Sequence, residues 1–206
     1  MTRITPRPIP VAELSLPRPD LSAREAVTLI RPHAKDAEPD WRGCMINSEA
    51  CADRDGRLTL GMGSWLVGYR SASGSIIRAT LGTTGHLFTQ KSASLVEPPP
   101  LFALDSEWLD STVVAEIVGR EPLVEGMQEN YNLHLNLQSV ADIGLFWQIT
   151  RGFFNQTAKH SISHSFGVDA RSGDVTLEWL ERSDHQTGKK HKSRRDRLNG
   201  GDWTPV

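Results

Sequence analysis

The fold is decided by the stretch Tyr131-Asn132-Leu133-His134-Leu135-Asn136-Leu137-Gln138, in which large apolar residues alternate with polar ones. Because successive side chains of a strand point to opposite faces, this alternation predicts a strand with one buried and one polar face. The polar side carries amide and imidazole groups, which both donate and accept hydrogen bonds. It forms the predicted binding stripe, made of Asn132, His134, Asn136 and Gln138. A sheet face turned to water would show the same pattern.

Further strands are predicted on both sides of this stretch, separated by turn residues such as Gly74, Gly85 and Gly173. In chain order they cover residues 57–60, 64–70, 75–81, 87–90, 143–150, 160–168 and 175–180. Residues 40–56 are predicted to be irregular. The spacing of Ser22 and Glu25 is that of a capping box and predicts the start of a first helix. A second helix is predicted to begin at Asp105 or Ser106 and to end near Val118.

These elements predict an α+β fold of two similar halves, each a helix followed by an antiparallel sheet of about four strands. Ser22 precedes Trp65 by 43 residues and Asp105 precedes Trp147 by 42, which favours an internal duplication. Both tryptophans are predicted to anchor the core. The predicted boundaries give a proline-rich segment 1–20, a first half 21–96, a proline-rich linker 97–104, a second half 105–184 and a flexible basic tail 185–206.

Charge is distributed unevenly along the 206 residues, although the formal net charge is only -2. Six Lys and Arg residues lie between Lys189 and Arg197, and the remaining chain holds 17 basic against 24 acidic residues. An acidic body argues against broad contact with nucleic acid, which is expected at most through that basic segment. No apolar run has the length of a membrane span or a signal peptide, so the sequence predicts a cytoplasmic protein without membrane contact.

Two short motifs are Trp65-Leu66-Val67-Gly68-Tyr69 and Gly167-Val168-Asp169-Ala170-Arg171-Ser172-Gly173-Asp174-Val175. The first resembles the tryptophan-bearing strand of the PepSY-type domain. The second resembles the closing hairpin of that family, with Ser172 in the place of a threonine. The resemblance implies helix-plus-sheet modules in tandem that bind or restrain a protease.

Side chains capable of catalysis or metal binding do not fall into a known pattern. Cys44 and Cys51 lack the Cys-x-x-Cys spacing of zinc sites, and two free thiols are expected. His160 and His164 lie on a predicted strand, where residues four apart are separated by about 13 Å, too far to share one metal ion directly. Phosphate-binding loops and serine-nucleophile motifs are absent from the sequence. We therefore predict no catalytic residue, no metal and no cofactor.

The sequence thus favours a non-enzymatic protein-binding module, such as an inhibitor or immunity-type protein, that acts through a sheet face or a groove between its halves. Its partner is expected to be another protein. The alternative is a small α+β enzyme whose pocket uses His134, His160 or His164 as acid or base.

Overall fold

The structure, a computed structural model, describes residues 10–34, 36–49, 52–59, 61, 63–91, 100–105, 108–129, 131–141, 143–155 and 159–206, without the side chains of 154 and 155. Cys51, the first nine residues of the proline-rich segment and residues 97–99 of the predicted linker lie outside the described residues.

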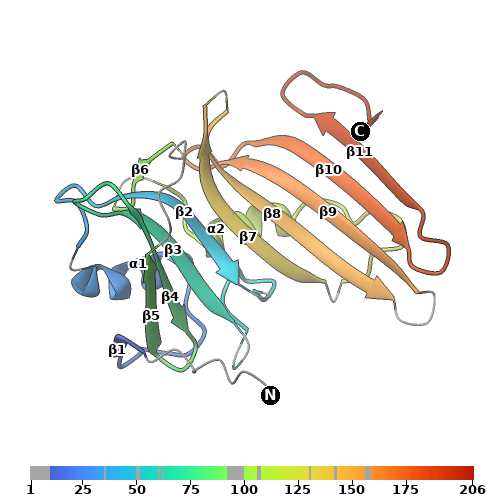
Figure 1. The fold of residues 1–206 in the computed structure, drawn as a ribbon. Helices are drawn as coiled ribbons and strands as arrows, with labels where there is room; N and C mark the ends of the chain where they lie inside the picture. Colours follow the sequence, from blue (N-terminus) through green and yellow to red (C-terminus); the bar gives the residue numbers. More distant parts are fainter. Residues whose placement is uncertain are drawn as a thin grey trace, which may run out of the picture.

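A single antiparallel sheet of twelve strands forms the body of the molecule (Figure 1). Its order is β1-β5-β4-β3-β2-β7-β8-β9-β10-β11-β12, and β6 pairs with β2 beside this path. The strands are β1 (Ala12–Glu13), β2 (Arg42–Glu49), β3 (Ser64–Arg70), β4 (Ile76–Gly82), β5 (His86–Lys91), β6 (Phe102–Ala103), β7 (Asn132–Val140), β8 (Gly144–Asn155), β9 (His160–Asp169), β10 (Val175–Asp184), β11 (Lys190–Asp196) and β12 (Thr204–Pro205).

The predicted α+β fold of two helix-then-sheet halves is therefore wrong. The protein is mainly β, with 48% strand against 11% helix, and its strands belong to one continuous sheet. The junction is the antiparallel pair β2–β7, in which Ile46 lies opposite Leu137 and Asn47 opposite Asn136. A pairing between strands so far apart in the chain leaves no local signal in the sequence, because it depends on two complementary edges meeting in space.

The central strand β2 lies within the stretch that was predicted to be irregular. Its apolar alternation is interrupted by Ser48, which is buried. The Ser48 hydroxyl accepts a hydrogen bond from the backbone N–H of Leu135 at 2.9 Å, so a polar side chain is satisfied at a core position. Of the strand predicted at 57–60, the described residues 57–59 form no strand, and Leu58 makes only an isolated bridge with Ala52; residue 60 lies outside the described residues.

Two short α-helices cover one face of the sheet. Helix α1 (Ala23–Ile30) begins after Ser22, and the predicted capping box with Glu25 is confirmed. A 3₁₀ turn, η1 (Arg31–His33), follows at Pro32. Helix α2 (Ser111–Gly119) begins after Asp110, several residues later than predicted. No helix of the described part of the chain is long and apolar enough to cross a membrane.

Register defines the two faces of the sheet, because directly opposed residues in neighbouring strands point to the same side. Leu135, Ile149 and Phe166 oppose one another across β7, β8 and β9 and are fully buried. They belong to one apolar core that includes Val27 of α1 and Val114 of α2. We call this side the covered face. No helix among the described residues covers the opposite side, which is turned to the viewer in Figure 1, and we call it the open face.

Trp65 and Trp147 are both fully buried, so their predicted role as core anchors is confirmed. The indole of Trp65 donates a hydrogen bond to the carbonyl oxygen of Leu21 at 2.9 Å, and that of Trp147 to the carbonyl oxygen of Leu109 at 2.8 Å. Leu21 and Leu109 each immediately precede the N-cap residue of a helix. Each tryptophan thus fixes the entry of one helix onto the sheet.

The segment expected to be a basic tail contributes β11 and β12 to the sheet. Trp203, which lies between β11 and β12, packs on the covered face, where its ring lies 5.0 Å from the Arg195 guanidinium and 6.4 Å from the His164 ring. Glu178 lies beneath them, with one carboxylate oxygen 2.6 Å from His164 Nε2 and the other paired with Arg195. Burial alone would raise the pKa of Glu178, but these two partners hold it below its usual value.

Candidate functional site

The predicted binding stripe lies at the centre of the open face. Within it, Asn136 is opposed by Asn47 of β2 on one side and by Gln148 of β8 on the other. Three amide side chains thus form a line across neighbouring strands, and we call them the amide row. Asn136 Oδ1 has no hydrogen-bond partner among the described residues, although it is screened from solvent. Amides present both a donor and an acceptor, so the row can pair with peptide groups of another chain.

Apolar side chains lie at both ends of the amide row. Beyond Asn47 come Leu66 of β3, Thr80 of β4 and Phe88 of β5, and beyond Gln148 come Gly167 of β9 and Leu177 of β10. Leu66 and Leu177 are buried but stand apart from the apolar core. They therefore form small apolar areas of the open face itself.

Two glycines of the open face leave room for larger side chains of neighbouring residues. A Cβ atom on Gly167 would lie 3.1 Å from Leu177 and 3.5 Å from the Trp179 ring. On the other side of the sheet centre, a Cβ on Gly68 would lie 2.9 Å from the Met45 side chain. A side chain at Gly167 would therefore press against Leu177 and Trp179, and one at Gly68 would have to displace Met45.

A second line of the open face runs from the stripe towards the C-terminal edge of the sheet. His134 is opposed by Thr150, followed by Ser165, Trp179 and Arg194. The hydroxyl groups of Thr150 and Ser165 are 2.8 Å apart and hydrogen-bonded. A cavity of about 280 Å³ adjoins this line. Its lining includes Ser163, Ser165, Trp179, Lys192 and the terminal Val206.

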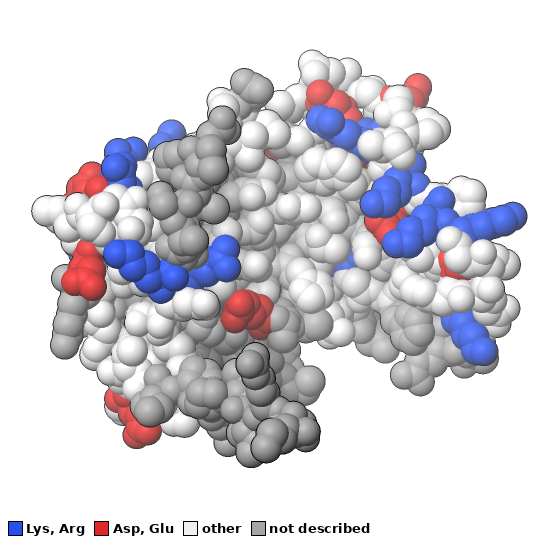
Figure 2. All heavy atoms as spheres, in the orientation of Figure 1, with Lys and Arg blue, Asp and Glu red and all other residues white. Residues whose placement is uncertain are grey.

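The open face carries no charged residue over the middle of β7, β8 and β9, whereas Glu49 of β2 and Arg78 of β4 are exposed on the same face. The outward residues of β7, β8 and β9 within residues 132–138, 146–152 and 161–167 include no Lys, Arg, Asp or Glu. Figure 2 shows this area in white, with Lys and Arg in blue over the C-terminal strands. The outward basic residues of β11 are Lys190, Lys192 and Arg194, and Glu181 of β10 pairs with both lysines.

Asn47 and Gln148 were not predicted as site residues, and they meet the stripe only through the strand pairing. The sequence holds a weak signal for Gln148, because this polar residue stands between the apolar Trp147 and Ile149 and is expected to point to the polar face of the strand. Asn47 lies in the strand that was not predicted.

The two histidines of β9 lie in different surroundings. His164 is 1% exposed and pairs with Glu178, so its imidazole cannot meet a substrate in this conformation. His160 is the first residue of β9 and lies beside a separate cavity. No group of three or more His, Cys, Asp or Glu side chains in the described ranges is arranged to hold a metal ion. Cys44 is a buried free thiol, and burial raises its pKa.

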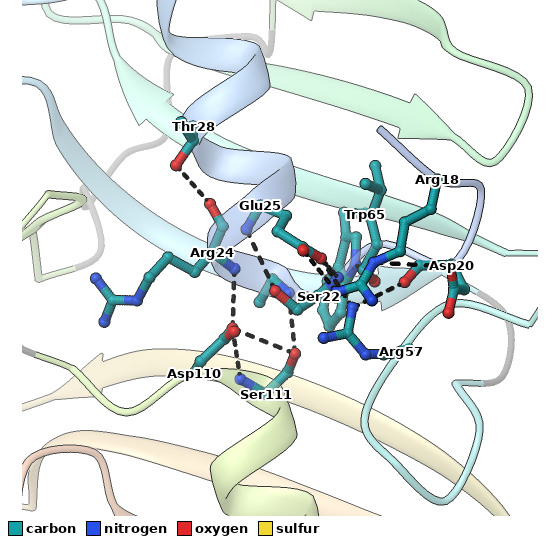
Figure 3. Close-up of polar contacts among 12 residues, drawn as sticks. Arg18, Asp20, Ser22, Arg24, Glu25, Thr28, Arg57, Trp65, Asp110 and Ser111 are labelled. Atoms are coloured by element: carbon teal, nitrogen blue, oxygen red, sulfur yellow. Dashed lines mark hydrogen bonds and ion pairs between the residues drawn. The ribbon is translucent and has the colours of Figure 1, made fainter. Parts of the chain in front are cut away.

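The N-termini of the two helices meet beside the sheet and share their capping groups (Figure 3). The Asp110 carboxylate accepts hydrogen bonds from the backbone N–H groups of Ser111 and Arg24, and the Ser111 hydroxyl accepts from Ala23. Residues that begin α2 therefore also cap α1. Since these donors are all satisfied within the chain, we assign the junction a structural role.

Glu25 is the charged centre of this junction. Its carboxylate accepts a hydrogen bond from the Ser22 N–H at 2.8 Å and forms ion pairs with Arg18 at 2.7 Å and Arg57 at 2.9 Å. Burial would raise the pKa of Glu25, but the Ser22 N–H and the two guanidinium groups outweigh it and lower the pKa to about 2. The carboxylate is therefore ionised at any pH above that value.

Replacing Glu25 with Gln should lower the free energy of unfolding by about 1 kcal/mol at pH 7, because glutamine can keep the capping hydrogen bond but loses both ion pairs. The stabilisation by Glu25 is complete above its unfolded-state pKa near 4.5 and is lost as the pH falls towards 2. The difference between the proteins should accordingly shrink over that range, as measured by urea unfolding. Glu116→Gln, at an exposed pair with Arg120, is the control and should change little. A difference independent of pH would contradict this account.

Searches of protein-family models, of curated proteins and of solved structures found no match to this chain. The resemblance to PepSY domains therefore stays a prediction from two short motifs.

Proposed function

We propose that this protein is a non-enzymatic binding protein that recognises another protein through its open face. The observation that carries the proposal is the amide row, which adjoins the part of that face over the middle of β7, β8 and β9 that carries no charged residue. Asn47, Asn136 and Gln148 come from three neighbouring strands and point the same way. The cores of protein interfaces are poor in charged residues and have a polar rim, and the open face has this distribution.

The charge distribution also indicates what kind of surface the partner has. The partner would present an uncharged patch with hydrogen-bond donors and acceptors to the amide row, and acidic groups to the outward basic residues of β11. Trp179 and the adjoining cavity of about 280 Å³ offer a place for one anchoring side chain, which is the usual source of interface energy. An inhibitor or immunity-type protein needs such a surface and no reactive group. We also propose, from the sequence, that the protein is located in the cytoplasm.

The test is to isolate the partner from the source cells and to measure its affinity for matched variants. Asn136→Arg places a charge in the middle of the amide row and should weaken binding at least tenfold. The control is Val113→Arg, which puts the same charge on the exposed side of α2; Val113 is 41% exposed. It should bind as the unchanged protein does. Both variants should have unchanged unfolding midpoints.

Equal affinity of the two variants for a single partner would contradict the proposal, because the contact would then lie elsewhere. Failure of the unchanged protein to retain any partner at moderate salt would contradict it as well.

A further inference from the structure

A second cavity, of about 470 Å³, lies where β9 begins, β10 ends and β11 begins. We call it the strand-end cavity. It is separate from the open face, and its volume falls within the range of small-molecule sites. Its lining comprises Glu125, Gly126, His160, Ser161, Ile162, Arg182, Ser183, Asp184, Lys189 and His191.

Register brings three basic side chains to the same side of the sheet around this cavity. Arg182 of β10 lies opposite Ile162 of β9 and opposite His191 of β11. Ile162 is a buried core residue of the covered face, so Arg182 and His191 project to that side too. His160 is two residues from Ile162 on the same strand and shares its direction. Three adjacent strands thus contribute nitrogen groups to one place.

The two cations of the strand-end cavity, Arg182 and Lys189, form no ion pair within the described part of the chain, whereas Arg195 of β11 is paired with Glu178. Asp184 also lines the cavity, but its Oδ1 accepts hydrogen bonds from the N–H groups of Thr187 and Gln186, which lower its pKa.

The remaining carboxylate of the lining, Glu125, is exposed on a loop. The cavity therefore holds two cations and two imidazoles beside two carboxylates, and neither carboxylate is ion-paired with Arg182 or Lys189 within the described residues.

We propose that the strand-end cavity binds a phosphate monoester. The guanidinium of Arg182 can hold two oxygens of a phosphate at once, and Lys189 adds a point charge. The imidazoles of His160 and His191 supply further hydrogen-bonding groups. Ile162 and Gly126 form an uncharged part of the wall, against which the organic group of an ester packs.

The probes are inorganic phosphate and phenyl phosphate, titrated into the full chain and followed by nuclear magnetic resonance and calorimetry. Phenyl phosphate should bind at least threefold more tightly than inorganic phosphate, because its ring can contact the uncharged wall at Gly126. Arg182→Met should weaken phenyl phosphate binding at least tenfold.

The matched control is Arg78→Met. It makes the same change on the open face, where Arg78 is exposed on β4, and should leave binding unchanged. If Arg182→Met does not fold, Lys189→Met at an exposed position gives the same test, with an expected loss of about threefold. Equal binding by the Arg182 and Arg78 variants would overturn the proposal, as would no binding of either probe. Equal affinity for the two probes would overturn the proposal that the ligand is an ester and would indicate a site for the free phosphate anion.

Discussion

Replacing Arg151 with alanine is expected to lower the free energy of unfolding by about 3–5 kcal/mol, because buried charge-assisted hydrogen bonds are lost and a cavity is left. Arg151 of β8 is fully buried, and its guanidinium donates to the carbonyl oxygens of Val118 at 2.7 Å and Glu121 at 3.1 Å. These carbonyls lie at the C-terminal end of α2, where the helix dipole favours a cation. The guanidinium also stacks 4.7 Å from the Phe166 ring and 5.3 Å from that of Tyr131.

The alanine variant would leave carbonyl groups without donors and a cavity between two aromatic rings. Arg151→Lys should lower the free energy of unfolding by about 1–2 kcal/mol, since one ammonium group cannot reproduce the planar set of donors of the guanidinium. The control is Arg120→Ala at the same helix end, where the side chain is 74% exposed and the expected change is below about 0.5 kcal/mol. Urea unfolding at pH 7 measures all three variants. If the free energy of unfolding falls no further in Arg151→Ala than in the control, water must replace the guanidinium as the donor to these carbonyl oxygens.

Replacing Gly56 with alanine should cost about 3 kcal/mol or more, from backbone strain and a direct clash. Gly56 has a φ of +71°, a conformation that costs an L-residue about 1–2 kcal/mol. A Cβ atom there would lie 2.2 Å from the carbonyl oxygen of Ser111 and 2.9 Å from the Ala115 side chain. The loop at Gly56 is therefore in contact with the backbone of the first turn of α2 and cannot accept a methyl group without moving.

Gly188 provides a matched control for this effect. Its φ is +70°, but a Cβ atom there would meet nothing within 4 Å. Gly188→Ala should therefore show the backbone strain alone, about 1 kcal/mol. Thermal or urea unfolding of the two variants separates strain from clash. Equal losses would mean that the loop and α2 move apart at little cost, and that their contact does not contribute to stability.

Local patterns in the sequence account for several elements of the structure. The alternation around Leu135 predicted both the strand β7 and the direction of its side chains, because the two-residue period is a property of the strand itself. The capping box at Ser22 and Glu25 placed the start of α1, since its hydrogen bonds close within one turn.

Other elements were missed because their stabilising contacts come from distant residues. The pattern of β11 is basic and polar on both faces, and its covered side is satisfied by the pair of Arg195 with Glu178 and by Trp203. Such a strand has no apolar alternation to detect. The later start of α2 at Asp110 likewise depends on hydrogen bonds to α1.

The sequence by itself determined which segments become strands such as β7 and which side of β7 is polar, since both follow from the chemistry of adjacent residues. Only the tertiary structure decided that the strands form one sheet, that Asn47 and Gln148 join Asn136 in the amide row, and that His160, Arg182 and His191 surround one cavity. The physical reason is that pairing between strands fixes which distant side chains become neighbours, and this register depends on the whole sheet closing around its core.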